Sequence, residues 1–124
     1  MLVVEKKGNN VEFRTSSLED ICMAVYTLIM LIPPGFVTSY GSIARVLGIH
    51  PRKVAFCLKK NTELIVIPCH RVVYNTGKLG GYSELGALFK KKLLELEGVI
   101  FEDDNRVSRD CIIDLGDLLN KSDQ

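Results

Sequence analysis

Residues 38–60 have the sequence TSYGSIARVLGIHPRKVAFCLKK, and they indicate the fold more clearly than any other segment. They predict a helix that begins near Ser39 and ends at Gly48, a residue that suits the left-handed position after a helix. Pro51 suits the first turn of a second helix, which is expected over 52–60. Two short helices joined by a tight turn are typical of a helix-turn-helix, although many such pairs do not bind DNA.

Positive charge lies at both ends of the second helix. Arg52 and Lys53 come first, and Lys59 and Lys60 come last. The net charge of the whole chain does not indicate nucleic-acid binding, because the chain contains 16 Lys and Arg and 15 Asp and Glu, for a net charge of +1. Most charge runs are solvated faces, so this clustering favours nucleic-acid binding without establishing it.

The segment before residue 38 predicts a hairpin and a long helix. In residues 1–15, the strand-forming segments 2–4 and 11–13 flank a turn-forming centre at 8–10, which is typical of a small β-hairpin. A two-stranded hairpin is marginal alone, so we expect it to pack on the rest of the domain. Ser17 is the expected N-cap of an apolar helix, with Asp20 three residues later, and Pro33 ends that helix.

The segment after residue 60 predicts shorter elements around a conspicuous hexapeptide, PCHRVV, at residues 68–73. In chain order we expect a buried strand over 64–67, a loop over 75–81, a helix over 85–97 ended by Gly98, a turn over 102–105 and a weak element over 112–119. The expected fold is mostly α with small β elements. Its centre is a winged helix-turn-helix-like three-helix core, preceded by a short β-hairpin.

Composition and cysteine spacing limit the class of protein. The 124 residues, of which 47% are hydrophobic, suffice for one compact domain. The four cysteines are Cys22, Cys57, Cys69 and Cys111. They form no CxxC motif and only two histidines accompany them, so no metal site is predicted. No secretion signal is recognisable, and the apolar stretch 21–32 is shorter than the roughly 20 residues that span a bilayer. We therefore expect a cytoplasmic protein with reduced cysteines rather than disulfides, and no membrane contact.

Cys69 is the candidate nucleophile, because His70 and Arg71 follow it directly. A free thiol has a pKa of about 8.5, so only a few per cent is thiolate at neutral pH. His70 can supply a base and Arg71 a positive field. Cysteine is also among the most frequently buried residues, and a core histidine often bonds to backbone. The pair by itself leaves the reactive and the structural interpretation open.

The hexapeptide at 68–73 resembles the active-site motif of the O6-alkylguanine-DNA alkyltransferases. Further segments resemble this family in its own order and spacing: residues 38–44 at the start of the helix-turn-helix, residues 51–54 at the start of its second helix, Asn61 eight residues before the cysteine, residues 80–83 in the substrate loop, and Glu97 with Gly98 at the end of the last conserved helix. The resemblance covers residues 18–101. It implies an alkyltransferase DNA-binding and catalytic domain there, between an N-terminal hairpin over 1–17 and a C-terminal extension over 102–124.

The resemblance implies a role for four residues in the chemistry. Cys69 would accept the alkyl group from O6 of guanine, and His70 would act as its base through a bound water. Glu97 would orient and polarise His70. Tyr40 would press on the DNA backbone beside the target nucleotide and donate a proton to the departing guanine. Transfer would be irreversible, once per molecule and without a cofactor.

The resemblance also implies how DNA is held. The partner would be double-stranded DNA containing O6-alkylguanine, bound by a monomer through the minor groove. O6 of guanine is engaged in pairing, so the nucleotide must be flipped out of the stack. Arg52 would occupy the vacated space. The remaining implied roles are further DNA contacts by Lys53 and Arg71, a backbone turn held by Asn61, positioning of the cysteine by Pro68, and pocket contacts by Tyr82 and Ser83.

The chain departs from the family pattern in several places. Many members carry a larger N-terminal domain, whereas only 17 residues precede the first expected helix here. Ala55 stands where members usually have glycine, Thr62 replaces a proline, and Glu84 places a carboxylate at the pocket rim. The acidity of the tail argues against its direct contact with DNA.

Three alternatives stay open on the sequence alone. A non-catalytic alkyltransferase-like damage sensor would bind alkylated guanine without reacting, but such proteins typically replace the cysteine. A plain helix-turn-helix module would bind DNA with Cys69 as a structural residue. A thiol hydrolase using Cys69 and His70 is remote, because adjacent residues on one strand rarely reach each other and no oxyanion loop is evident.

Overall fold

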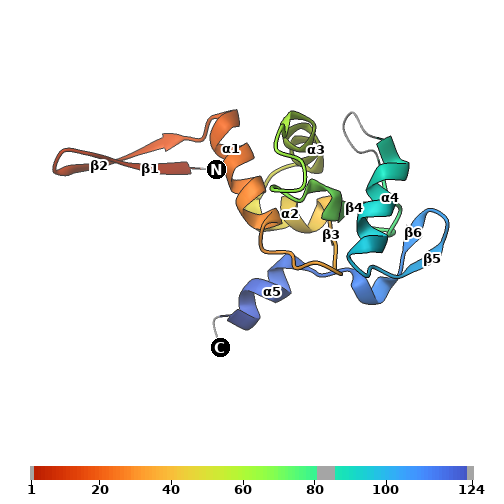
Figure 1. Cartoon of the computed structure of the whole chain (residues 1–124). Coiled ribbons are helices and arrows are strands. Elements are labelled where there is room, and N and C mark those ends of the chain that lie inside the picture. Colours follow the sequence, from red (N-terminus) through yellow and green to blue (C-terminus); the bar gives the residue numbers. More distant parts are fainter. Residues whose placement is uncertain (1, 81–85, 123–124) are drawn as a thin grey trace.

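A two-stranded hairpin projects from a helical body (Figure 1) in the computed structural model, which describes residues 2–80 and 86–122. The hairpin consists of β1 (Leu2–Lys7) and β2 (Asn10–Thr15). The helices are α1 (Leu18–Ile29), α2 (Tyr40–Leu47), α3 (Pro51–Lys60), α4 (Gly86–Leu96) and α5 (Leu115–Ser122). Two short strand pairs complete the body: β3 (Thr38–Ser39) beside β4 (Val72–Val73), which are parallel, and β5 (Phe101–Asp103) beside β6 (Arg106–Val107), which are antiparallel. The expectation of a mostly helical fold with small β elements is confirmed.

The hairpin forms as expected but does not pack on the body, so that part of the prediction is wrong. Val4 and Phe13 face each other across the strands and are 59% and 71% exposed. Only two residues connect β2 to α1. Arg14 also binds Asp20 in the first turn of α1, at 2.6 Å. The hairpin therefore projects outward from the start of α1 (Figure 1), where the short connection and this ion pair hold it.

Helix α1 begins where the sequence predicts. Ser17 Oγ accepts a hydrogen bond from the Asp20 backbone N–H, and the Asp20 carboxylate accepts one from the Ser17 N–H, which together form a capping box. The helix ends at Ile29, four residues before Pro33, because a proline has no N–H to donate to the carbonyl four residues before it and its ring clashes with that carbonyl. Its buried residues, Ile21, Cys22, Val25 and Ile29, are spaced at one helical face.

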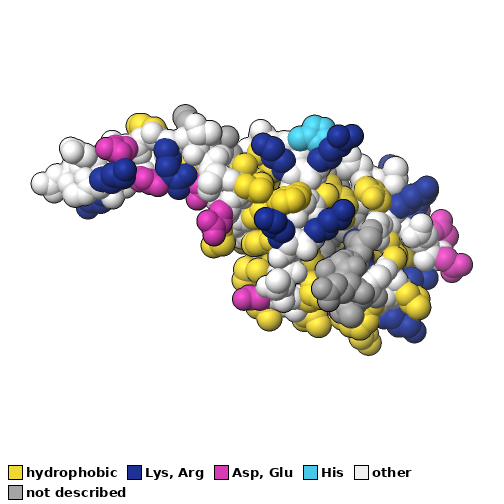
Figure 2. All heavy atoms as spheres, turned by 90° about the horizontal axis from the view of Figure 1, so that it is seen from above, with side chains coloured by type: hydrophobic (Ala, Val, Ile, Leu, Met, Phe, Trp, Pro, Cys, Tyr) yellow, Lys and Arg dark blue, Asp and Glu magenta, His cyan; other side chains and the backbone are white. Residues whose placement is uncertain are grey.

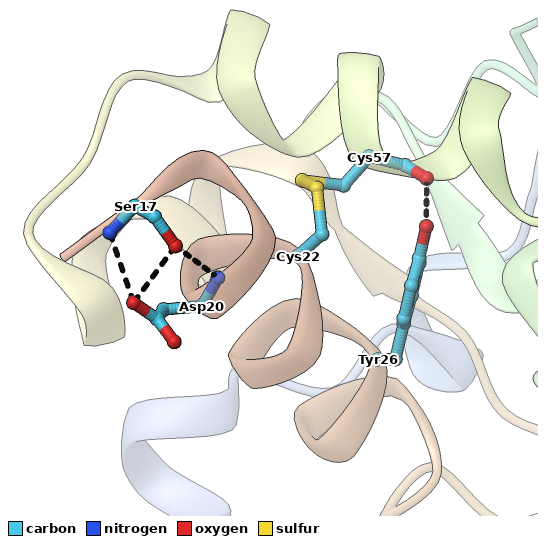
Figure 3. Close-up of a disulfide and its surroundings, with 5 residues drawn as sticks. All are labelled: Ser17, Asp20, Cys22, Tyr26 and Cys57. Atoms are coloured by element: carbon cyan, nitrogen blue, oxygen red, sulfur yellow. Dashed lines mark hydrogen bonds between the residues drawn. A yellow bond between two sulfur atoms is a disulfide. The ribbon is translucent and has the colours of Figure 1, made fainter.

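A disulfide joins Cys22 of α1 to Cys57 of α3, whose Cα atoms are 5.1 Å apart (Figure 3). The expectation that all four cysteines are reduced is therefore wrong for this pair, while Cys69 and Cys111 are free. The two residues lie 35 positions apart in the sequence and meet only because the buried faces of α1 and α3 pack together. Tyr26 strengthens this contact, because its hydroxyl donates to the Cys57 carbonyl at 2.5 Å (Figure 3).

Residues 64–67 do not form the expected buried strand. Leu64 and Ile67 pair with each other in an isolated bridge, and Ile65 and Val66 are 56% and 68% exposed. The Asn61 side chain closes this turn, because its amide donates to the Ile67 carbonyl at 3.1 Å and its oxygen accepts from the Glu63 N–H at 2.9 Å. The segment thus curls back on itself before it reaches Cys69.

The core has two parts on either side of the β3–β4 pair. One contains the inner faces of α1, α2 and α3 with Cys69, and the other contains Val37, Val73, Leu79 and Leu94 with residues of the β5–β6 region. The C-terminal segment is part of this packing. Leu115 of α5 is fully buried, and its N–H donates to Ser42 Oγ of α2 at 2.7 Å. None of the described helices combines the length and apolarity needed to cross a membrane.

Candidate active site

Cys69 begins a short 3-10 helix, Cys69–Arg71, with Pro68 as the residue before its first turn. The side chain is 4% exposed and belongs to the core around α1, α2 and α3. Burial raises the pKa of the Cys69 thiol, while the hydrogen bond from Asn61 and the positive charge of Lys90 partly oppose that rise. The resting residue is therefore a protonated thiol, which needs a base before it can attack.

Asn61 lies at the C-cap of α3 and reaches the thiol directly. Its Nδ2 is 3.4 Å from Cys69 Sγ and 3.1 Å from the Ile67 carbonyl. One amide therefore holds the cysteine, the turn before it and the end of α3 together. The Asn61 side chain is buried, and its contact with the thiol is shielded from water.

His70 lies fully buried beside the cysteine and is paired with Glu97, just beyond the end of α4. His70 Nε2 is 3.1 Å from Glu97 Oε2. Burial lowers the pKa of His70, and the hydrogen bond and charge of Glu97 oppose this in part. The imidazole is therefore neutral at neutral pH. Because the Nε2–H group of His70 donates a hydrogen bond to the Glu97 carboxylate, Nδ1 is the ring nitrogen that can accept a proton.

Arg71 is turned inward and holds Glu97. Its Nη2 and Nε bind the two carboxylate oxygens of Glu97 at 2.5 and 3.0 Å, and its Nη1 donates to the Ile32 carbonyl at 2.8 Å. Burial raises the pKa of Glu97, but the hydrogen bonds from Arg71 and His70 outweigh it and the net shift is downward. The side chain of Arg71 is only 13% exposed. This bidentate pairing gives Arg71 an internal partner, whereas the resemblance implies a contact with DNA.

Tyr40 opens α2 near the cysteine, and Ser39 caps the helix by accepting from the Ser42 N–H at 3.0 Å. Its ring lies 5.4 Å from the ring of Tyr74, centre to centre. Burial raises the pKa of Tyr40 to about 12, with smaller contributions from Tyr74 and Cys69. The hydroxyl is therefore a neutral proton donor at the side of the site. Gly80 approaches this pair closely, since a Cβ on it would lie 3.0 Å from the Tyr74 ring.

Lys90 and Tyr74 are part of the site but were not found from the sequence. Lys90 is 1% exposed, and its Nζ donates to the carbonyls of Val72, at 2.6 Å, and Leu79. Burial lowers the pKa of Lys90 to about 8, and its charge interacts favourably with Cys69. The run of three lysines looks like a solvated face, but Lys90 lies four residues before the buried Leu94. That helical spacing was the available signal.

The outer face of α3 is cationic. Arg52, Lys53, Lys59 and Lys60 are all exposed, and Figure 2 shows Lys and Arg side chains gathered on the side of the molecule where α3 lies in Figure 1. His50 caps the helix, because its Nδ1 accepts from the Arg52 N–H at 3.0 Å. Val54, Cys57 and Leu58 form the buried inner face of the helix.

The described residues do not include the three that the sequence places in the pocket or at its rim. Tyr82, Ser83 and Glu84 lie outside the described residues. Within residues 2–80 and 86–122, no group of three or more His, Cys, Asp or Glu is placed to hold a metal ion. The described arrangement is thus a buried thiol with a histidine–glutamate pair, a neutral tyrosine hydroxyl and an adjacent cationic helix.

Comparison of the sequence with protein families identifies one match over most of the chain. Residues 20–99 match the family described as 6-O-methylguanine DNA methyltransferase, DNA binding domain. The methylated-DNA–protein-cysteine methyltransferases of Saccharolobus solfataricus and Metallosphaera sedula are 49% and 48% identical over 62% and 64% of this chain. The chain spans about half the length of these curated relatives, 50% in each case.

Solved structures with the same fold include proteins bound to DNA. Mycobacterium tuberculosis OGT in complex with DNA is 38% identical, with a TM-score of 0.60, over 68% of this chain and 52% of that one. The Pyrococcus kodakaraensis O6-methylguanine-DNA methyltransferase is 43% identical, with a TM-score of 0.59, over 63% and 46%. Atl1 of S. pombe, in complex with damaged DNA containing O6-carboxymethylguanine, is 27% identical with a TM-score of 0.64, over 75% and 91%.

Proposed function

Because the chain belongs to the 6-O-methylguanine DNA methyltransferase family, we propose that it repairs double-stranded DNA by moving an alkyl group from O6 of guanine to Cys69. The observation that carries this proposal is the His70–Glu97 hydrogen bond beside the buried thiol. A buried thiol needs a base, and a neutral histidine with a fixed tautomer is the base most suited to neutral pH. The name of the relatives, methylated-DNA–protein-cysteine methyltransferase, supports the same reaction.

The first step is proton removal from the thiol. Nδ1 of His70 takes the Cys69 proton through a water molecule, and Glu97 stabilises the imidazolium that forms. Arg71 keeps Glu97 ionised and in place through its two hydrogen bonds. The positive charge of Lys90 favours the thiolate at the same moment. The chain thus separates the base, which accepts the proton, from the groups that stabilise the resulting charges.

The second step is transfer. The thiolate attacks the alkyl carbon, a C–S bond forms, and the bond between that carbon and O6 breaks with its electron pair left on guanine. The Tyr40 hydroxyl donates a proton to the guanine, and the proton held by His70 returns to the tyrosinate through solvent. The products are an unmodified guanine and an S-alkyl Cys69. A thioether is stable, so each molecule acts once and no cofactor is needed.

The buried position of Cys69 requires the base to come to it. In a duplex, O6 of guanine lies in the pairing edge, so the nucleotide is flipped out of the stack and into the site. Arg52 on the exposed face of α3 fills the gap, while Lys53 and its neighbours bind phosphates. We infer that the protein works as a cytoplasmic monomer on damaged duplex DNA.

A second candidate is damage binding without transfer. It is favoured by the fold shared with Atl1 of S. pombe, whose structure was solved in complex with damaged DNA containing O6-carboxymethylguanine. It predicts tight, damage-selective binding with an unreacted Cys69. A plain helix-turn-helix module predicts DNA binding without selectivity for damage.

Stoichiometric label transfer tests the proposal. The protein is mixed with a duplex carrying O6-[methyl-³H]methylguanine, and protein-bound radioactivity is counted against time. We expect about one label per molecule, its loss in Cys69→Ser and its retention in Cys111→Ser, since Cys111 is the other buried free cysteine. Selective binding with no label would support the damage sensor, and equal binding to intact DNA with no label would support the plain module.

A further inference from the structure

Phe56 is a large apolar side chain on the outer face of α3, where the fold does not require it. The residue is 41% exposed, whereas Val54, Cys57 and Leu58 on the inner face are buried. It belongs to neither part of the core. The other exposed residues of this helix are Pro51 and four cations, Arg52, Lys53, Lys59 and Lys60. An exposed ring among cations is available to a partner outside the chain.

The spacing of the neighbours places the ring in a line with two of these cations. Arg52, Phe56 and Lys60 lie four residues apart, so they follow one side of the helix at intervals of about 6 Å. Lys60 Nζ lies 4.8 Å from the centre of the Phe56 ring. On this side of the molecule, hydrophobic side chains lie between the Lys and Arg side chains (Figure 2). The helix thus presents an apolar ring with a cation one turn before it and one turn after it.

The side chains on this face of α3 suit two kinds of DNA contact, which are phosphate binding by the cations and base stacking by the ring. Arginine and lysine bind phosphates with little regard to sequence. No residue on the outer face of α3 is Asn, Gln, Ser or Thr, the uncharged side chains that read base edges. A phenyl ring has no hydrogen bond to offer, so its favourable DNA partner is the flat face of a base. Minor-groove proteins insert phenylalanine between base pairs, which unstacks the step and bends the duplex.

We propose that Phe56 is an apolar wedge that enters the base stack one helical turn from Arg52 and bends the DNA. This inference rests on the proposed function, because it takes α3 as the helix that binds DNA. Opening a neighbouring step weakens the stacking that holds the target nucleotide, so the wedge assists flipping. It also suits a protein that acts at any sequence, because the ring reads no base.

The test uses undamaged duplex DNA with 2-aminopurine beside the contacted step and a dye at each end. Wild type is expected to raise the 2-aminopurine fluorescence and to shorten the distance between the dyes. Phe56→Ala should bind roughly 5- to 100-fold more weakly, the range for loss of one aromatic–base stack, and should abolish both signals. Phe56→Leu should keep part of each, since leucine also serves as a wedge.

Two controls isolate the ring. Phe36→Ala removes a phenyl ring of matched exposure, 40%, away from α3 and should change nothing. Phe56→Ala should leave unchanged the slope of the logarithm of the DNA association constant against the logarithm of the salt concentration, because no charge is lost. Lys59→Met should reduce that slope by about 1.

Label transfer on the same preparations separates failure of the wedge from failure of the function. If wild type transfers methyl groups and Phe56→Ala binds and bends DNA as well as wild type, the wedge is wrong and the proposed function stands. If wild type neither binds duplex DNA nor transfers the label, both are wrong. Slower transfer in Phe56→Ala, with unchanged reactivity of Cys69 towards iodoacetamide, would support the wedge.

Discussion

Asn61 Nδ2 lies 3.4 Å from Cys69 Sγ, so the residue that ends the cationic helix α3 also contacts the thiol. The same amide donates to the Ile67 carbonyl, and its oxygen accepts from the Glu63 N–H. The position of the cysteine therefore depends on the position of the helix that we assign to DNA. A shift of the end of α3 should therefore move the Cys69 thiol, and a shift of the thiol should move the end of α3.

Replacement of Asn61 by Ala should lower the stability of the fold and make the Cys69 thiol less acidic. The Ile67 carbonyl keeps the Cys69 N–H as a donor but loses the Asn61 amide, and the Glu63 N–H loses its acceptor. Each lost hydrogen bond costs about 0.5–1.5 kcal/mol of stability. The pKa of Cys69 should rise further, because the hydrogen bond from Asn61 lowers it. Thermal unfolding gives the first effect, and the pH dependence of iodoacetamide modification gives the second. A normal thiol titration in Asn61→Ala would contradict the role given to this contact.

The rate of transfer should fall as the pH drops through the lowered pKa of His70. The imidazole accepts the thiol proton only when neutral, and burial holds its pKa below the ordinary 6.5, so activity should persist at neutral pH and disappear in acid. Single-turnover rates between pH 4.5 and 8 measure this limb. A rate that keeps its full value well below the ordinary histidine pKa and shows no acid limb would contradict the assignment of His70 as base.

Glu97→Gln should shift that limb and lower the rate. Glu97 raises the pKa of His70, so its removal moves the acid limb to lower pH, while loss of imidazolium stabilisation slows transfer by roughly two to four orders of magnitude. Glu95→Gln, at an exposed position in the last turn of α4, is the matched control and should behave as wild type. Equal pH profiles for the two variants would make Glu97 a merely structural residue.

Lys90→Met should make the thiol less acidic. The charge of Lys90 favours the Cys69 thiolate, so its loss raises the thiol pKa and slows transfer at neutral pH. Lys92→Met removes an exposed charge two residues away and serves as the control. Thiol reactivity against pH distinguishes the two. Stability alone does not, because Lys90→Met also leaves the Val72 carbonyl without its donor.

Reduction of the Cys22–Cys57 disulfide should lower stability. The bridge closes a loop between residues 35 apart, for which the chain-entropy relation gives about 3–4 kcal/mol. Urea unfolding with and without reductant measures the loss, and Cys57→Ser should match the reduced protein. In the Cys111→Ser variant the effect of reductant should remain. Four alkylatable thiols in the denatured, unreduced protein would show that the bridge is absent.

Local signals in the sequence predicted much of the fold. The capping box at Ser17, the left-handed Gly48 after α2 and Pro51 at the start of α3 act within a few residues, so their effect does not depend on the rest of the molecule. The hexapeptide motif likewise pointed to Cys69 and His70. Such features are readable because sequence distance and spatial distance nearly coincide.

Features that depend on tertiary contacts were missed. The sequence cannot show that the Cys22 and Cys57 faces meet, or that Asn61 bends 64–67 into a turn. Lys90 was hidden in a charge run, because composition says little about which face of a helix is buried. Arg71 was assigned to DNA, since its internal partner Glu97 is 26 residues away.

The mass of the peptide that contains Cys69 tests the central claim most directly. The protein is incubated with a duplex holding O6-methylguanine, digested and analysed by mass spectrometry, with Cys69→Ser as the control. The account predicts one added methyl group on Cys69, in proportion to the methylguanine lost from the DNA, and none in the variant. An unmodified Cys69 after binding to the damaged duplex would contradict it.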